Sequence, residues 1–136
     1  MDYNIASMNE ERRDSLGRRI PPQQIEVHPR QWVVALGEAA RNELFAKYGV
    51  DPSPATIEEH MKEAWRNPRL RIRVNIKAYK LIDQELGEAI RISEEKGGTK
   101  KEIRKRARRL IQEKYERVEQ DPERNYSYLD GVVLSD

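Results

Sequence analysis

Apolar residues recur at three- and four-residue intervals along much of the chain, and this spacing predicts helices. We expect the clearest of them over residues 29–48, 54–66 and 100–120. Proline at positions 29 and 54 suits the first turn of a helix, because that turn does not need the amide proton that proline lacks. Gly49 and Asp121-Pro122 are typical of helix ends. The pattern therefore predicts an all-α protein.

The segment after Asn67-Pro68 permits two interpretations. Apolar residues alternate with basic ones from Leu70 to Ile76, which is typical of a strand. The same apolar residues continue at helical spacing further on, and Asn-Pro is a good helix start. We predict one helix over residues 68–95, with a strand over 69–77 as the alternative. The first half of this helix is apolar on two sides, which implies burial against more than one neighbour.

These elements predict a four-helix bundle-like domain over residues 28–122, between an extended N-terminal arm (1–27) and a short C-terminal tail (123–136). Ile20-Pro21-Pro22 forces an extended path in the arm. The arm packs either on the body of its own subunit or along a neighbouring subunit or a nucleic acid. The tail is apolar around Asp130-Gly131, where we predict a turn, and we expect it to dock on the domain.

Composition limits the class of protein. A chain of 136 residues is one domain, and charged and hydrophobic residues each make up 37% of it. The absence of cysteine excludes disulfides and thiolate metal sites. No apolar run approaches the roughly 20 residues of a membrane span, and the N-terminus lacks the features of a signal peptide, so we expect a soluble protein. Abundant Arg, Lys and Glu are typical of proteins from hot habitats.

The net charge is only +2, but the charges are segregated into blocks. Residues 66–80 hold six bases and no acid, and residues 81–95 hold five acids and one base. Residues 96–109 hold eight bases and one acid, and residues 110–123 hold five acids and two bases. A turn at Gly97-Gly98 would fold the last two helices into an antiparallel hairpin and set each acidic block beside a basic one. Helix pairing is thus the simplest account of the blocks.

The basic block at 96–109 exceeds what one neighbouring helix can neutralise. It also begins a helix, with Thr99 as N-cap and Glu102 as its capping-box partner. Amide donors and cations at a helix start are typical of phosphate sites. We therefore predict nucleic-acid binding by Arg69, Arg71, Arg73, Lys100, Lys101, Arg104, Lys105, Arg108 and Arg109, assisted by Arg12, Arg13, Arg18 and Arg19 of the arm.

The expected nucleic acid is a duplex contacted through its backbone. Aromatic residues make up only 7% of the chain, and single-strand readers need aromatic rings on which bases stack. A helix-turn-helix reader over residues 54–80 is a weaker alternative, because its turn would be Asn-Pro rather than glycine-centred. Phosphate contacts alone give binding that is independent of sequence and sensitive to salt.

The residue inventory does not suggest catalysis. There is no Gly-rich phosphate loop, nucleophile elbow or zinc-ligand spacing. His28 precedes a proline at a helix start, and His60 lies among glutamates on a polar helix face, where we expect it to be solvated. We therefore expect no enzyme, no cofactor and no metal site.

In layout the chain resembles the major capsid (coat) proteins of filamentous archaeal viruses. The resemblance rests on the arm with Ile20-Pro21-Pro22, the helix from Pro29 and the Arg-rich hairpin around Gly97-Gly98. It implies a structural protein of the virion, a homo- or heterodimer with a related subunit, that coats A-form-like duplex DNA in a helical nucleocapsid filament. It also implies a hyperthermophilic host. The chain departs from this pattern in its nearly neutral net charge and its acidic segment 110–123.

The main alternative is a protein of another class. A small viral or bacterial regulatory protein in the cytoplasm could bind an acidic protein partner, with the charge blocks serving only helix pairing.

Overall fold

The computed structural model describes residues 27–134, and its regular elements there are all helical. They are α2 (Gln31–Tyr48), α3 (Pro54–Arg66), α4 (Pro68–Glu95), α5 (Lys100–Glu119), the 3-10 turn η2 (Ser127–Leu129) and α6 (Asp130–Val133). The predicted all-α class is confirmed, and the predicted helix boundaries agree to within two residues. Apart from Val27, the predicted arm lies outside the described residues.

The stretch with two interpretations is one continuous helix, α4. Asn67 caps its start, because the side-chain oxygen accepts a hydrogen bond from the Arg69 amide at 3.1 Å. Val74 on one side is buried, whereas Ile72 and Ile76 on another side are 59% and 47% exposed. Two neighbours, α2 and α3, pack on α4, but one of the two apolar sides of its first half faces solvent.

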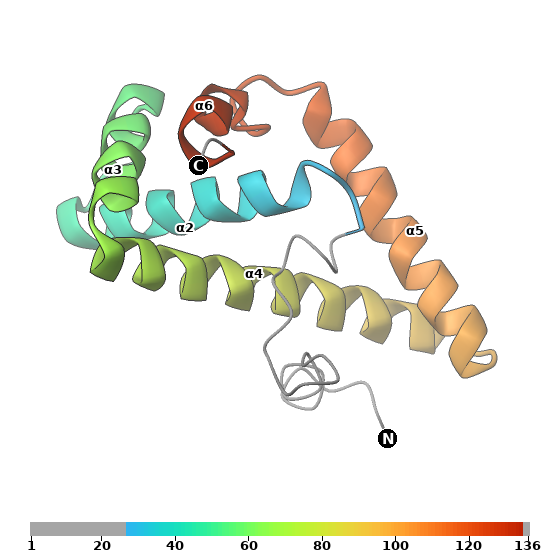
Figure 1. Cartoon of the computed structure of the whole chain (residues 1–136). Coiled ribbons are helices and arrows are strands. Elements are labelled where there is room, and N and C mark those ends of the chain that lie inside the picture. Colours follow the sequence, from blue (N-terminus) through green and yellow to red (C-terminus); the bar gives the residue numbers. More distant parts are fainter. Residues whose placement is uncertain (1–26, 135–136) are drawn as a thin grey trace.

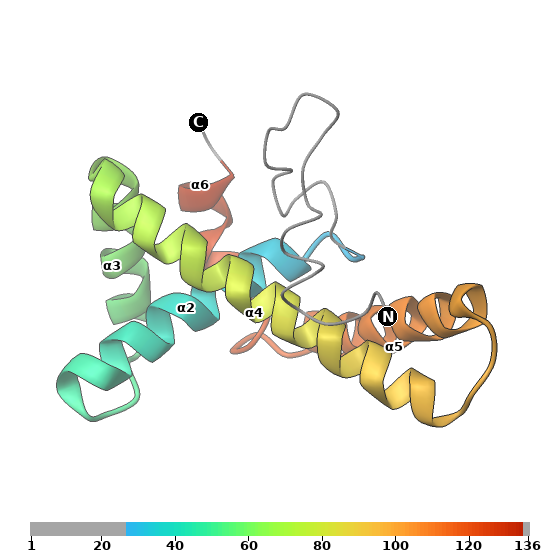
Figure 2. The ribbon, with the colours of Figure 1, turned by 90° about the horizontal axis from the view of Figure 1, so that it is seen from below.

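The longest helix, α4, connects the parts of the molecule (Figures 1 and 2). The helices α2, α3 and α5 all contact it, and α5 turns back from its C-terminal end at an oblique angle. At 1.5 Å per residue, its 28 residues extend over about 42 Å. The turn into α5 and the turn from α3 therefore lie at opposite ends of the molecule (Figure 1).

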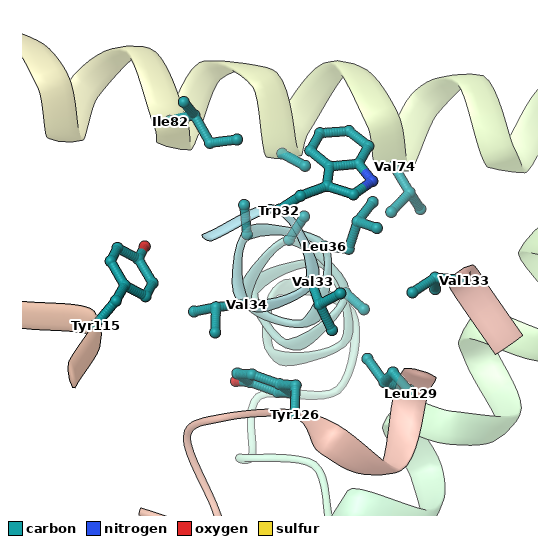
Figure 3. Packing of buried hydrophobic residues seen from close by; sticks show 14 of the residues in the cluster. Trp32, Val33, Val34, Leu36, Val74, Ile82, Tyr115, Tyr126, Leu129 and Val133 are labelled. Atoms are coloured by element: carbon teal, nitrogen blue, oxygen red, sulfur yellow. The ribbon is translucent and has the colours of Figure 1, made fainter. Parts of the chain in front are cut away.

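The core surrounds the first half of α2. Every residue from Gln31 to Gly37 is buried, so the helix is covered on several sides rather than along the single apolar stripe that its sequence suggested. Figure 3 looks along α2 and shows Val74 and Ile82 of α4 on one side of it and Tyr126 on the opposite side. The small residues of α2 allow this close approach from both sides.

The C-terminal tail supplies the second cover of α2. Tyr126, Leu129 and Val133 are buried, and η2 and α6 contact α3. Asp130 and Gly131 belong to α6, so the predicted turn at this position is wrong. Because the helical turn η2 continues into α6, Leu129 and Val133 lie one turn apart on the same side, and both side chains reach the core. Asp130 also accepts a hydrogen bond from Arg30 Nη1 at 2.8 Å, which ties the tail to the start of α2.

Candidate nucleic-acid interface

The glycine pair forms the turn into α5 as predicted. Gly97 and Gly98 have φ angles of 73° and 113°, a backbone conformation that side chains with a Cβ rarely adopt. The chain then enters α5 through the capping box: Thr99 Oγ1 accepts from the Glu102 amide at 3.2 Å, and Glu102 Oε1 accepts from the Thr99 amide at 2.9 Å.

The capping box changes the predicted phosphate site. The hydrogen bond from the Thr99 amide, followed by the one with its hydroxyl, lowers the pKa of Glu102, so this carboxylate stays ionised at the helix start. A negative charge therefore already compensates the amide dipoles there. Any phosphate contact at α5 falls to the side chains of the helix rather than to its N-terminal amides.

Four cations on the outer face of α5 have no partner in the part of the chain that the structure describes. Lys101, Lys105, Arg108 and Arg109 are exposed, with neither an ion pair nor a hydrogen bond from their side chains to residues 27–134. They lie on the side of the helix away from Ile103 and Ala107, which are buried. We call these four residues the α5 basic face. Two further predicted residues, Lys100 and Arg104, are exposed beside it.

The basic residues predicted on α4 lie elsewhere. Arg69, Arg71 and Arg73 are in the first two turns of α4, about 33–39 Å along that helix from its end at the turn into α5. Arg71 lies over the Trp65 ring, 4.7 Å from its centroid, and Arg73 Nε is 2.5 Å from Glu43 Oε1. The structure therefore does not unite these residues with the α5 basic face as one surface. Arg12, Arg13, Arg18 and Arg19 lie outside the described residues.

The hairpin of α4 and α5 is antiparallel, as the charge blocks predicted. Arg106 Nη1 donates to the Ser93 carbonyl at 2.6 Å, and Lys114 pairs with Glu85 nearer the middle of α4. Figures 1 and 2 show α5 turning back from the end of α4 at an oblique angle, so that the two helices diverge away from the turn. These two contacts show that the helices run in opposite directions, because the later residue of α5 contacts the earlier residue of α4.

Among the described residues, few ion pairs join the acidic and basic blocks of α4 and α5. Arg91 of the acidic block pairs with Glu88 and Glu95 of its own helix, at 2.5 and 3.0 Å. Arg106 of the basic block contacts backbone carbonyls instead of carboxylates. The first half of α4 pairs with Glu43 of α2 rather than with residues 110–123. Within the basic block at 96–109, the four residues of the α5 basic face make no ion pair with a described carboxylate.

Two partly buried carboxylates join helices, and neither was identified from the sequence. Glu43 of α2 contacts His60 of α3 at 3.0 Å, and Arg73 and Lys77 of α4 at 2.5 and 3.3 Å. Burial opposes ionisation of Glu43, but the hydrogen bond from His60 and the charges of Lys77 and Arg73 outweigh it and lower its pKa. His60 is thus a partly buried contact rather than the solvated residue we predicted. Its partner is 17 positions away, so no local pattern revealed it.

The second carboxylate, Glu85 of α4, joins α2 and α5. It accepts hydrogen bonds from Gln31 Nε2 and from the Tyr115 hydroxyl, both at 2.9 Å, and it contacts Lys114. Burial, followed by the charge of Glu85, raises the pKa of Tyr115 well above its ordinary value. Tyr115 therefore remains a hydrogen-bond donor and supports packing of α5 on α4.

Other kinds of site were sought in the described residues. Between residues 27 and 134 no group of three or more His, Asp or Glu side chains is arranged to hold a metal ion. Over the same residues no helix combines the length and apolarity needed to cross a bilayer. The α5 basic face remains as a cluster of four exposed cations that make no ion pair with residues 27–134. No protein-family model, no curated protein and no solved structure matches this chain.

Proposed function

We propose that this protein is a structural DNA-binding protein that coats duplex DNA through the α5 basic face. The observation that carries the proposal is the set of four exposed cations without an ion pair among the described residues. From Lys101 to Arg109 they extend over about 12 Å of helix, which lets them reach more than one phosphate of a duplex. Each phosphate contact releases counterions, which favours binding at low salt.

The chemistry of this face favours contact with the backbone rather than with bases. Its side chains are lysines and arginines, with no aromatic ring among the exposed residues from Lys100 to Arg109 on which a base could stack. Such contacts position a protein on DNA without reading its sequence. The layout shared with coat proteins of filamentous archaeal viruses supports the finer proposal: a homo- or heterodimeric subunit of a helical nucleocapsid filament in a virion.

Binding of unrelated duplexes tests the proposal. We expect similar affinities for duplexes of different sequence and a slope of log affinity against log salt of about −4, one unit per cation of the face. The variant K101E/K105E/R108E/R109E should lose binding and keep its helical circular dichroism. The matched control reverses four exposed cations elsewhere, K47E/R66E/K80E/R117E, and should bind DNA much better than the face variant. Equal loss in both variants, or affinity independent of salt, would contradict the proposal.

One observation favours the alternative function, binding of an acidic protein partner. Ile72 and Ile76 are exposed on α4 beside Arg69, which is also exposed. Apolar side chains next to a cation suit an acidic amphipathic helix. Light scattering separates the two functions: growth of mass on addition of duplex DNA supports a coat protein, and no change supports the alternative.

A further inference from the structure

The outer face of α5 carries a charge pattern that inverts about Gln112. At four, seven and eleven positions before Gln112 the residues are basic, and at the same distances after it they are acidic. Steps of four and three residues keep the five of them that lie within α5 near one side of that helix. The basic set is Arg108, Lys105 and Lys101, and the acidic set is Glu116, Glu119 and Glu123. All six are exposed, and Glu123 lies just beyond the end of α5 at Glu119.

We propose that two copies of this chain pair through this face, with their α5 helices antiparallel and the two-fold axis at Gln112. With the two-fold axis at Gln112, a residue that precedes Gln112 in one copy lies opposite a residue of the second copy. That opposite residue follows Gln112 by the same number of positions. Arg108 then faces Glu116 of the partner subunit, Lys105 faces the partner's Glu119, and Lys101 comes opposite the end of the helix, beyond which the partner's Glu123 follows. A parallel arrangement would instead set like charges against each other.

The surroundings of the face within one chain leave it available for such a contact. Glu119 contacts His28 at 3.2 Å, but within residues 27–134 Lys101, Lys105, Arg108, Glu116 and Glu123 make no ion pair. Figure 1 shows α5 at the edge of the molecule, where it rises away from the C-terminal end of α4. The complementary charges therefore lie where a second copy can approach.

The proposed function includes a dimeric subunit but not the surface through which two copies pair. This inference names that surface and does not depend on DNA binding. It uses three of the four cations of the α5 basic face, so the dimer and a polyanion compete for the same side chains. Exposed ion pairs are individually weak and are screened by salt, so this dimer is a low-affinity, salt-sensitive one. Without DNA, pairing covers the cations that would otherwise bind polyanions indiscriminately.

Sedimentation equilibrium of the full chain without DNA tests the pairing. We expect dimers at about 20 mM salt and association weaker by about ten-fold or more at about 500 mM. Each of the variants K101E/R108E and E116K/E123K should associate about ten-fold or more weakly at low salt, because reversed positions then face like charges. An equimolar mixture of the two variants should regain the wild-type affinity, since every reversed position can then face an opposite charge.

The control R66E/K80E makes the same change in net charge as K101E/R108E on exposed positions of other helices, and it should associate like the wild type. Circular dichroism verifies that every variant is folded. The proposal is overturned if the wild type stays monomeric at low salt and high concentration, or if the mixture does not regain affinity. Duplex binding is measured separately, so lost pairing with intact DNA binding refutes only this inference, and the reverse result refutes only the proposed function.

Discussion

Gly37 leaves the space on α2 that the ring of Tyr126 fills, and a Cβ at this position would overlap that ring. Tyr126 is fully buried, and its φ angle of 54° lies in the left-handed region, which non-glycine residues seldom adopt. Its hydroxyl contacts Glu38 and accepts a hydrogen bond from Arg41 Nε at 2.9 Å. Burial and the contact with Glu38 raise its pKa, so the hydroxyl stays protonated. This pair of residues therefore fixes the tail on α2.

Gly37→Ala should destabilise the fold. The added methyl group displaces the Tyr126 ring from a closely packed position, and we expect a loss of about 1–3 kcal/mol in the free energy of unfolding. Urea denaturation followed by circular dichroism measures it. Gly131→Ala is the matched control, because nothing lies within 4 Å of a Cβ there. Equal stability of the G37A variant and the wild type would show that the tail does not pack as described.

Glu43 should make the stability depend on pH. Its pKa is lowered in the folded state, so the stabilisation from the ionised carboxylate is complete above its ordinary pKa of about 4.3 and is lost as the pH falls through the lower folded value. Glu43→Gln should cost about 1–2 kcal/mol at neutral pH.

Denaturation of the wild type and the E43Q variant at a series of pH values measures this dependence. The difference in unfolding free energy should be constant above about pH 5 and shrink below about pH 4. Glu58→Gln is the control, because Glu58 forms an i,i+4 pair with Lys62 at the surface and should contribute only about 0.3–0.5 kcal/mol. If the difference in unfolding free energy between the wild type and E43Q increased at low pH, the contacts of Glu43 described above would be contradicted.

At the scale of elements, local signals account for the helices. Ser53, Asn67 and Thr99 each accept a backbone hydrogen bond at a helix start, which is why the predicted boundaries lie so close to the observed ones. Those residues act within three positions of themselves, so the sequence alone reveals them. The tail was mispredicted because its conformation depends on Gly37 and α3, which are far away in sequence.

The capping box of α5 yields a prediction that separates folding from binding. Glutamine also serves in a capping box, so Glu102→Gln should preserve α5 while removing a negative charge beside the α5 basic face. We expect duplex DNA to bind about two- to three-fold more tightly at low salt. Fluorescence anisotropy with a labelled duplex measures the affinity. Glu63→Gln, the same change on α3, should have a smaller effect, and equal gains would speak against a role for the start of α5.

At the scale of the whole molecule, α4 separates the two groups of basic residues that were predicted to act together. The sequence revealed that both groups are basic, but not that Arg71 and Arg73 contact Trp65 and Glu43. Those contacts join residues through the tertiary fold, and charge counts along the chain do not reveal them. The same limitation applies to the pairing of the acidic and basic blocks.

The separation predicts unequal effects of single charge reversals on DNA affinity. Arg108→Glu should weaken duplex binding about three- to ten-fold at low salt, because it removes one phosphate contact from the α5 basic face. Arg69→Glu should change the affinity by less than about two-fold, since Arg69 lies about 39 Å along α4 from the turn into α5. Titrations of both variants against one duplex provide the comparison. A larger effect of R69E would move the interface to the other end of the molecule.

Arg106 has a consequence for the order in which the chain acquires structure during synthesis. Its guanidinium donates to the Ser93 and Gly97 carbonyls at 2.6 and 3.0 Å, and thereby satisfies acceptors at the end of α4. The last turn of α4 contains no basic residue of its own. The end of α4 thus acquires these two bonds only after α5 has been synthesised. A nascent chain that stops before residue 106 should show a frayed end of α4, visible as rapid amide hydrogen exchange there.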